Sequence, residues 1–241
     1  MLDGGGGARS ASRPRSVLLA GATGLVGAHV LRKLGEDRGV DRIEVPVRRP
    51  IPVAPAKARV RVVDFARLAH HPELFRVDQL FLCLGTTIKK AGSQEAFRAV
   101  DFDLEVEMAK RARDGGAQDC LMISAVGADP RSRVFYSRVK GEAEEAVKAM
   151  GWRKLAILRP SLIVGERKER RPAEKATMAV AKVIGPLMVG PLRRYRGIAA
   201  EDIAEAMARL ARREAAGTTV YESEAIQAVS DEATPPIGRS N

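Results

Sequence analysis

Length, composition and charge narrow the classes of protein that this chain can represent. It has 241 residues, of which 45% are hydrophobic, so we expect one large domain with a sizeable core over residues 16–229. The sequence has no run of about 18 apolar residues, so it predicts no membrane span. The net charge of +11 comes from basic residues mixed with acidic ones, with only 4% aromatic residues, and this pattern does not favour nucleic-acid binding.

The ends of the chain are polar. Residues 1–15 consist mainly of Gly, Ser, Arg and Pro, which predicts a disordered tail, and residues 230–241 predict a loose one. The start has no apolar core of a secretory signal. Cys83 and Cys120 lie in apolar runs and are expected to be buried, unpaired thiols. These features favour a reducing, cytoplasmic location. No Cys or acidic partner accompanies the histidines at ligand spacing, so we expect no metal site.

Residues 16–27, SVLLAGATGLVG, predict a buried strand, a tight turn and the start of a helix. Gly21 turns the chain out of the strand, Gly24 leaves room for a pyrophosphate, and Gly27 allows close packing of helix on strand. The free N–H groups of the new helix then face the phosphates. We interpret the stretch as a dinucleotide-binding turn, and a glycine-rich turn of an ordinary α/β protein is the alternative.

The second predicted strand, residues 43–47, is followed by Arg48 and Arg49. In a dinucleotide fold the end of this strand meets the adenosine ribose, where an acidic residue binds a 2′-hydroxyl and arginine accommodates a 2′-phosphate. Glu44 precedes the strand end, so Arg48 and Arg49 take the position, and NADP(H) is favoured over NAD. Two solvated loop arginines are the alternative. Pro46 is an awkward residue inside a central strand.

The third predicted strand, residues 60–63, ends at Asp64. Asp64 either accepts a hydrogen bond from the adenine amino group or caps a helix over residues 66–76. The fourth strand, residues 80–84, is wholly apolar and leads to Leu84, Gly85 and Thr86, where a flat cofactor can cross the strand end.

Helices and strands continue to alternate along the chain. The patterns predict a helix over 93–114, a strand over 118–123, a helix over 134–150, a strand over 155–158, helices over 173–185 and 201–213, and a strand over 218–221. This order predicts an α/β fold, a Rossmann-type doubly wound parallel sheet. A small C-terminal helical lid is expected from about residue 161.

Tyr136 and Lys140 are four residues apart on a predicted helix and therefore share one face. Ser124 ends the preceding strand, at the sheet edge where ligands bind. A nearby ammonium lowers the pKa of a phenol toward the working range, so Tyr136 is the candidate acid/base and Lys140 its partner. Ser124 would hold the substrate's carbonyl oxygen. The alternative is a Tyr–Lys pair on a helix surface.

Together these motifs resemble the short-chain dehydrogenase/reductase superfamily, in particular its atypical members. The greatest similarity is to the HIV Tat-interacting-protein family of reductase-like proteins and its bacterial relatives. The resemblance covers about residues 16–215 and is carried by residues 21–27, 83–87, 91–93, 97, 100–101, 124, 127–128, 136–142, 159–160 and 167–172.

This resemblance implies an NADP-type cofactor and names the residues that hold it. With Gly21, Arg49, Asp64 and Leu84 added from the patterns above, the expected cofactor-binding residues are Gly21, Thr23, Gly24, Leu25, Val26, Arg48, Arg49, Asp64, Leu84, Gly85, Thr86, Tyr136, Lys140, Pro160 and Leu162. Many relatives with sugar substrates carry Asn on the helix after strand four. Here the comparable stretch is 100–103, VDFD, which puts a proton relay through that Asn in doubt.

The expected function is that of an NADP(H)-dependent oxidoreductase that transfers hydride to or from a small carbonyl or alcohol. The alternative is a non-catalytic protein that binds NADPH and regulates or contacts protein partners. A nucleic-acid binder rests on charge alone. The patterns leave monomer and homodimer open and do not name a substrate.

Overall fold

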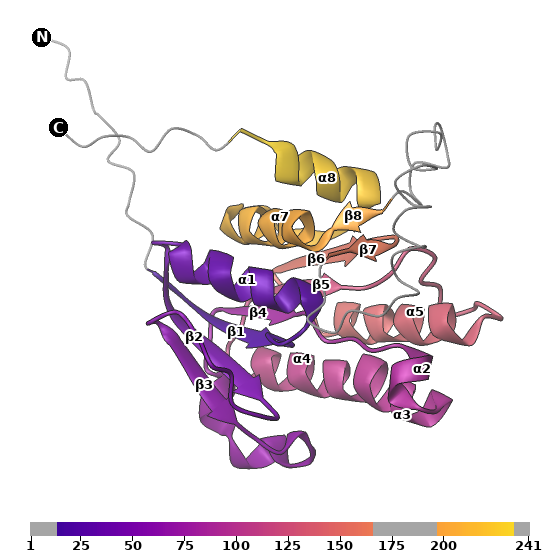
Figure 1. Ribbon diagram of the computed structural model, residues 1–241, viewed down its shortest axis with the longest axis horizontal. Helices are drawn as coiled ribbons and strands as arrows, with labels where there is room; N and C mark the ends of the chain where they lie inside the picture. Colours follow the sequence, from indigo (N-terminus) through magenta and orange to yellow (C-terminus); the bar gives the residue numbers. More distant parts are fainter. Residues whose placement is uncertain (1–13, 166–196, 234–241) are drawn as a thin grey trace, which may run out of the picture.

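A computed structural model describes residues 14–165 and 197–233 of the chain. Seven strands form one sheet in the order β3-β2-β1-β4-β5-β6-β9. Every neighbouring pair in this sheet is parallel. Helices cover both faces (Figure 1). The predicted fold class, a Rossmann-type α/β sheet, is therefore confirmed.

The elements follow one another largely in the expected places. The strands are β1 (Arg15–Ala20), β2 (Val40–Val47), β3 (Ala58–Val62), β4 (Gln79–Leu82), β5 (Asp119–Ile123), β6 (Lys154–Arg159), β7 (Ile163–Val164), β8 (Ile198–Ala199) and β9 (Gly217–Glu222). The α-helices are α1 (Leu25–Glu36), α2 (Ile88–Ala91), α3 (Gln94–Arg98), α4 (Glu105–Asp114), α5 (Phe135–Lys148), α7 (Ala200–Arg212) and α8 (Ser223–Asp231). Short β7 and β8 pair with each other outside the main sheet.

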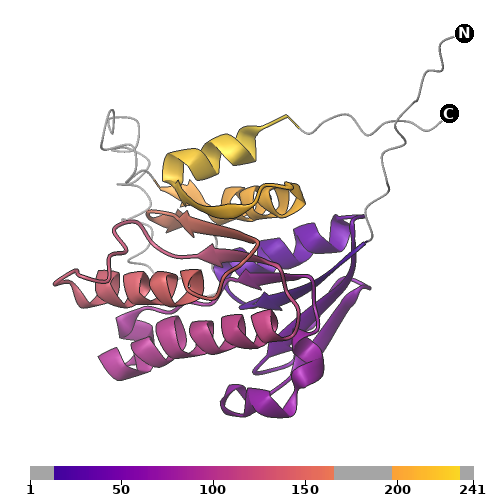
Figure 2. The same ribbon diagram turned by 180° about the vertical axis from the view of Figure 1, so that it is seen from behind.

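Two apolar layers hold the sheet between its helices. On one face α1, α7 and α8 pack against alternate strand residues such as Val17, Leu19 and Phe81. On the other face α4 and α5 pack against the intervening residues, such as Leu18 and Leu80. The opposite views in Figures 1 and 2 show both layers. Because side chains of a strand alternate between faces, central strands buried on both faces are apolar on both, as β4 and β5 are after their first residues, Gln79 and Asp119.

Pro46 lies inside β2 without interrupting it. The pairing of β2 with β1 ends at Glu44, whereas its pairing with β3 continues to Val47. The N–H of Ile43 and the carbonyl of Val47 bond toward β3. Backbone groups of successive residues point to opposite sides of a strand, so the nitrogen of Pro46 faces β1. It lies beyond the end of the β1–β2 pairing, and no hydrogen bond between these strands is lost.

Two expected helices are built differently. Residues 66–76 form two short 3₁₀ helices, η1 (Phe65–His70) and η2 (Pro72–Phe75), because Pro72 starts a new turn. The helix expected over 93–114 consists of α3, a π-helical segment η3 (Ala99–Leu104) and α4. π-helical segments inside α-helices occur frequently at functional sites.

The ends of the domain also differ in detail from expectation. Arg15 belongs to β1, and α8 runs through Ser230 into Asp231, where a loose tail was expected. The expected helix over 173–185, with most of the lid, lies outside the described residues. Helix α7 packs on α1, and β9 extends the main sheet beside β6. The division of the chain into tails, domain and lid stays a prediction.

The strand order defines where a ligand crevice must lie. The chain builds outward from β1 in one direction through β2 and β3, and in the other from β4 through β5 and β6. In such sheets ligands bind outside the carboxyl ends of the strands, at this switch point between β1 and β4.

Candidate functional site

The glycine turn follows β1 at the switch point. Gly21 has a φ of +89°, and a Cβ there would lie 2.2 Å from the carbonyl oxygen of Cys83. A Cβ on Gly27 would lie 2.1 Å from the carbonyl oxygen of Gly21. Glycine is therefore required at both positions, because the turn packs directly against the end of β4 and α1 packs directly against the turn.

Helix α1 begins at this turn without a side-chain cap. Its N-cap is Gly24, which has no side chain that could accept a hydrogen bond from the first turn. Thr23 and Gly24 are exposed, Leu25 is half-buried and Val26 is buried. Uncapped N–H groups and the positive end of the helix dipole form a site for an anion. This cradle fits the diphosphate of a dinucleotide.

The turn after β4 forms the neighbouring wall of the crevice. Leu84 is half-buried, Gly85 is exposed, and the backbone N–H of Thr86 donates to Asp101 Oδ2 at 2.9 Å. A Cβ on Gly85 would meet Asp101 Oδ1 at 3.7 Å. Asp101 of η3 therefore lies directly behind this wall and fixes its backbone.

Lys140 of α5 lies in a buried cluster with two carboxylates. Its Nζ is 2.8 Å from Asp101 Oδ1 and 3.1 Å from Glu105 Oε1. Tyr136 lies one turn earlier on α5 and is half-buried, with its ring centroid 5.4 Å from that of Phe97. The structure thus brings Tyr136 and Lys140 together as expected and adds two acidic residues.

The two carboxylates change the electrostatics expected of Tyr136. Burial raises the pKa of Tyr136 above its ordinary value; Lys140 lowers it, and Asp101 and Glu105 raise it. The net lowering of this pKa that was expected is therefore not found, because burial, together with Asp101 and Glu105, outweighs the lowering by Lys140. Burial opposes the charged form of Lys140, but these two carboxylates outweigh it and raise the pKa of the ammonium.

Ser124 has a different partner from the one expected. It is buried after β5, and its Oγ donates to Glu144 Oε1 at 2.5 Å. Glu144 is also buried and accepts two hydrogen bonds from Arg159, at 2.9 and 2.6 Å. The hydroxyl proton of Ser124 is thus bound within the protein, and in this arrangement it joins β5 and β6 to α5. A role in holding a substrate oxygen stays a prediction.

The remaining expected cofactor residues lie around the same sheet edge. Arg48 and Arg49 are exposed and directly follow β2. Asp64 follows β3 and accepts from the N–H of Ala66 at 3.0 Å, so it caps η1; its adenine contact is untested. After β6, Pro160 is buried and Leu162 is 49% exposed.

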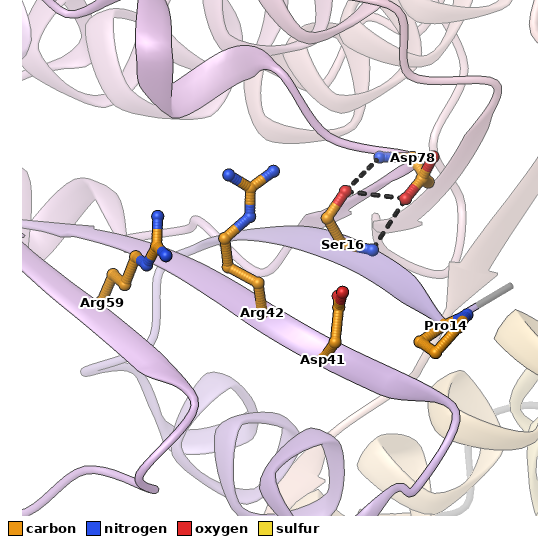
Figure 3. A pocket seen from close by; sticks show the side chains of 6 residues that line it. All are labelled: Pro14, Ser16, Asp41, Arg42, Arg59 and Asp78. Atoms are coloured by element: carbon orange, nitrogen blue, oxygen red, sulfur yellow. Dashed lines mark hydrogen bonds between the residues drawn. The ribbon is translucent and has the colours of Figure 1, made fainter.

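A separate pocket of about 410 Å³ lies at the opposite, amino end of the strands (Figure 3). Arg42 and Arg59 project from β2 and β3 into it, and Asp78 faces them, bonded to Ser16. None of the expected site residues lines it, so this pocket is distinct from the crevice.

Residue patterns alone missed the roles of Asp101, Glu105 and Glu144. Asp101 and Glu105 are four residues apart, a spacing that places two acidic groups on one helical face. Glu144 likewise follows Lys140 by four residues on α5. In each case the sequence did contain a signal. It was a charged residue on a helical face that also carries core residues.

The sequence pattern described as the NAD dependent epimerase/dehydratase family matches residues 17–222. This chain belongs to that family. The match spans the glycine turn, the Tyr136–Lys140 helix and the whole main sheet except the first residues of β1.

Several similar proteins come from fungi. The protein fmp52, mitochondrial, of Emericella nidulans is 41% identical over 177 residues, which cover 70% of this chain and 76% of the relative. The protein of the same name from Aspergillus fumigatus is 38% identical, with 73% and 78% covered. That of Eremothecium gossypii is 35% identical, with 68% and 74% covered.

Solved structures share the fold. MoeE5 in complex with UDP-glucose and NAD superimposes with a TM-score of 0.64 at 16% identity, covering 85% of this chain and 74% of that one. The Bordetella bronchiseptica enzyme WbmG in complex with NAD superimposes with a TM-score of 0.63 at 14% identity, covering 93% and 80%.

These comparisons settle some expectations and correct one. The cytoplasmic location is contradicted, because the three fungal relatives are all named mitochondrial. Membership of the wider reductase superfamily is confirmed, while the narrower resemblance to the HIV Tat-interacting-protein family stays a prediction. Over residues 14–165 and 197–233 no helix is both long and apolar enough to span a membrane.

Proposed function

We propose that this protein is a nicotinamide-dinucleotide-dependent oxidoreductase that acts on a small carbonyl or alcohol. The observation that carries the proposal is the position of Tyr136 over buried Lys140 on α5, beside a sheet edge with an uncapped glycine turn. When bound, the dinucleotide supplies or accepts the hydride. The chain's own residues position both partners and move the proton.

Tyr136 is the proposed acid/base. Its phenol is protonated at neutral pH, which is the form that donates a proton to a carbonyl oxygen during reduction, although the raised pKa makes it a weaker acid. Lys140 orients the ribose next to the nicotinamide, and Asp101 holds the Gly85–Thr86 wall against the cofactor. Pro160 and Leu162 would line the nicotinamide.

We further propose NADP(H) as the preferred form of the cofactor. Arg48 and Arg49 lie exposed at the end of β2, where a 2′-phosphate is read in this fold. Structural neighbours that contain NAD support dinucleotide binding in general. The double change Arg48→Ala/Arg49→Ala should weaken NADPH binding by about tenfold or more, the loss of a charge-assisted hydrogen bond, and leave NADH binding unchanged.

Fluorescence titration with NADPH and NADH measures both affinities. Arg38→Ala is the matched control, because Arg38 is an exposed arginine at the other end of β2. Equal losses for both dinucleotides in the double variant would contradict the preference.

Turnover tests the oxidoreductase proposal itself. The purified protein is incubated with NADPH and a panel of aldehydes, ketones and quinones, and absorbance of the reduced nicotinamide is followed. Sustained oxidation that depends on both partners supports the proposal. Binding of NADPH without any turnover, with alcohols and NADP⁺ tested in the reverse direction, would oppose it.

A second candidate is a binding protein that holds the dinucleotide without reacting. Two observations favour it: the hydroxyl of Ser124 is bound to Glu144, and the pKa of Tyr136 is raised rather than lowered. In that case NADPH raises the melting temperature by mass action while no substrate is consumed.

The relatives' names also support a location at mitochondria. A fusion of the full chain to a fluorescent protein, expressed in the source cell and compared with a mitochondrial dye, tests this. A diffuse signal throughout the cytoplasm would overturn it.

A further inference from the structure

The cluster around Lys140 contains more negative than positive charge. Lys140, Asp101 and Glu105 have side-chain exposures of only 4%, 1% and 0%. One ammonium therefore faces two carboxyl groups in a site without bulk solvent. If both carboxyl groups were ionised the cluster would carry a charge of −1, which is costly in a buried site.

Glu105 is the member with the least support for a negative charge. Asp101 Oδ2 accepts the N–H of Thr86. Oε2 of Glu105 has no hydrogen-bond partner within residues 14–165 and 197–233; Oδ1 of Asp101 has none either, but it lies 2.8 Å from Lys140 Nζ. A proton on Glu105 removes the excess charge while Asp101 keeps its contacts with Thr86 and Lys140.

The surroundings of Glu105 come from several elements. Burial raises the pKa of Glu105 to about 7, with Lys140 lowering it and with Asp101 and Glu144 raising it. The thiols of Cys83, after β4, and Cys120, in β5, are also coupled to this carboxyl, and burial raises the pKa of both. Both thiols are therefore neutral at neutral pH, and the carboxyl is the member of this set that titrates there.

The cluster adjoins the crevice through two of its members. Asp101 supports the backbone of Gly85 and Thr86, and Lys140 lies one turn from Tyr136. On the proposed function, on which this inference rests, the nicotinamide end of the cofactor would lie on the other side of these groups. That ring carries a positive charge when oxidised and none when reduced.

We propose that Glu105 determines which oxidation state of the nicotinamide cofactor the site prefers. Glu105 keeps its proton when the reduced, uncharged ring is bound. When the oxidised ring is bound, the carboxyl O–H bond breaks, the proton passes to the solvent, and the resulting carboxylate compensates the ring's positive charge. Charges in a buried site interact more strongly than they do in water, so one carboxylate behind the wall of the crevice is enough to bias the choice.

The consequence is a pH-dependent preference. As the pH rises from 6 to 8, the affinity for the oxidised form should increase relative to that for the reduced form by about fivefold, the change expected over this range if the bound charge shifts one carboxyl pKa from about 7 by about one unit. The 2′-phosphate of NADP(H) is present in both forms, so its own titration cancels in the ratio.

Isothermal titration calorimetry on the full chain with NADP⁺ and NADPH tests the proposal. Affinities are measured at pH 6, 7 and 8, and at pH 7 in two buffers of different ionisation enthalpy, which reports protons released on binding. Wild type should release more proton with NADP⁺ than with NADPH. Glu105→Gln, which has the same shape but cannot ionise, should release equal amounts and show a ratio independent of pH.

Glu107→Gln is the matched control, because Glu107 lies on the same helix but is 42% exposed and paired with Arg111. It should behave as wild type. If Glu105→Gln fails to fold, infrared difference spectra of wild type answer the question, since adding NADP⁺ should remove the band of a protonated buried carboxyl and adding NADPH should not.

The outcomes separate this inference from the proposed function. Binding of neither dinucleotide to wild type would overturn the proposed function. Binding of both with an affinity ratio that does not change with pH, or an unchanged ratio in Glu105→Gln, would overturn the role of Glu105 and leave the proposed function standing.

Discussion

At the level of single residues, Tyr136 and Ser124 show how much a buried environment changes the chemistry of a side chain. Both lie at the sheet edge where the strand order placed them. Their partners, however, are acidic residues: Asp101 and Glu105 around the Tyr136–Lys140 pair, and Glu144 at Ser124. The residue types alone are therefore an incomplete description of this site.

Replacing Tyr136 by Phe removes the phenolic hydroxyl and keeps the ring that packs on Phe97. We expect turnover to fall by about 100-fold or more, the usual contribution of a positioned acid/base, with dinucleotide affinity nearly unchanged. Steady-state kinetics and fluorescence titration measure the two effects. Tyr221→Phe in β9 is the control and should keep its turnover. Wild-type rates in Tyr136→Phe would refute the acid/base role.

Replacing Arg159 by Met removes the partner that makes two hydrogen bonds to buried Glu144. Lys148 is 3.7 Å from Glu144 and compensates only in part. We expect the free energy of unfolding to fall by about 3–5 kcal/mol, because a buried charge is left largely unpaired. Urea denaturation measures this loss.

Arg32→Met supplies the comparison for that change. Arg32 pairs with Glu36 and Glu201 on the surface, where all three side chains are well exposed. Its loss should cost no more than about 1 kcal/mol. Similar losses in the two variants would show that the Ser124–Glu144–Arg159 network contributes little to stability.

At the level of elements, the turn between β1 and α1 depends on close backbone packing. Gly21→Ala should lower the free energy of unfolding by more than about 3 kcal/mol and abolish dinucleotide binding, because its Cβ would overlap the carbonyl of Cys83 at 2.2 Å. Thermal and urea denaturation measure the loss of stability.

The control separates the overlap from the cost of a positive φ. Gly92 has a φ of +93°, close to that of Gly21, but a Cβ there meets nothing within 4 Å. Gly92→Ala should therefore cost only about 1–2 kcal/mol, the price of the left-handed conformation. If both variants lose the same amount, the close approach of the turn to β4 is not what requires glycine.

At the level of the whole molecule, Glu105 should make stability depend on pH. The pKa of Glu105 is about 7 in the folded protein, against an ordinary value of 4.5. A carboxyl with a raised pKa holds its proton in the folded state where the unfolded chain has lost it. Its stabilising contribution is therefore complete below about pH 4.5 and is lost as the pH rises through about 7.

We expect the stability of wild type to decrease relative to Glu105→Gln between pH 5 and pH 8, by up to about 3 kcal/mol. Urea denaturation of both proteins across this range gives the difference. Parallel stability curves for the two proteins would contradict the raised pKa and with it the charge balance of the Lys140 cluster.

Local patterns were enough for the sheet and for the position of the crevice. Apolar runs of strand length predicted all seven strands of the main sheet, including β9 near the C-terminal end of the domain, and periodicity placed α1, α5 and α7. Backbone requirements and amphipathic faces are local properties, so neighbouring residues in the sequence reveal them.

Only the tertiary structure decided which charged groups meet. It paired Lys140 with Asp101 and Glu105, engaged Ser124 with Glu144, and accommodated Pro46 where the β1 ladder ends. It also showed helix α8, which runs to Asp231 where a loose tail was expected. The physical reason is that a periodic pattern shows which residues face the core, whereas the cost of burying a charge depends on partners that the chain brings together from 20 or more residues away, as it does for Ser124 and Glu144.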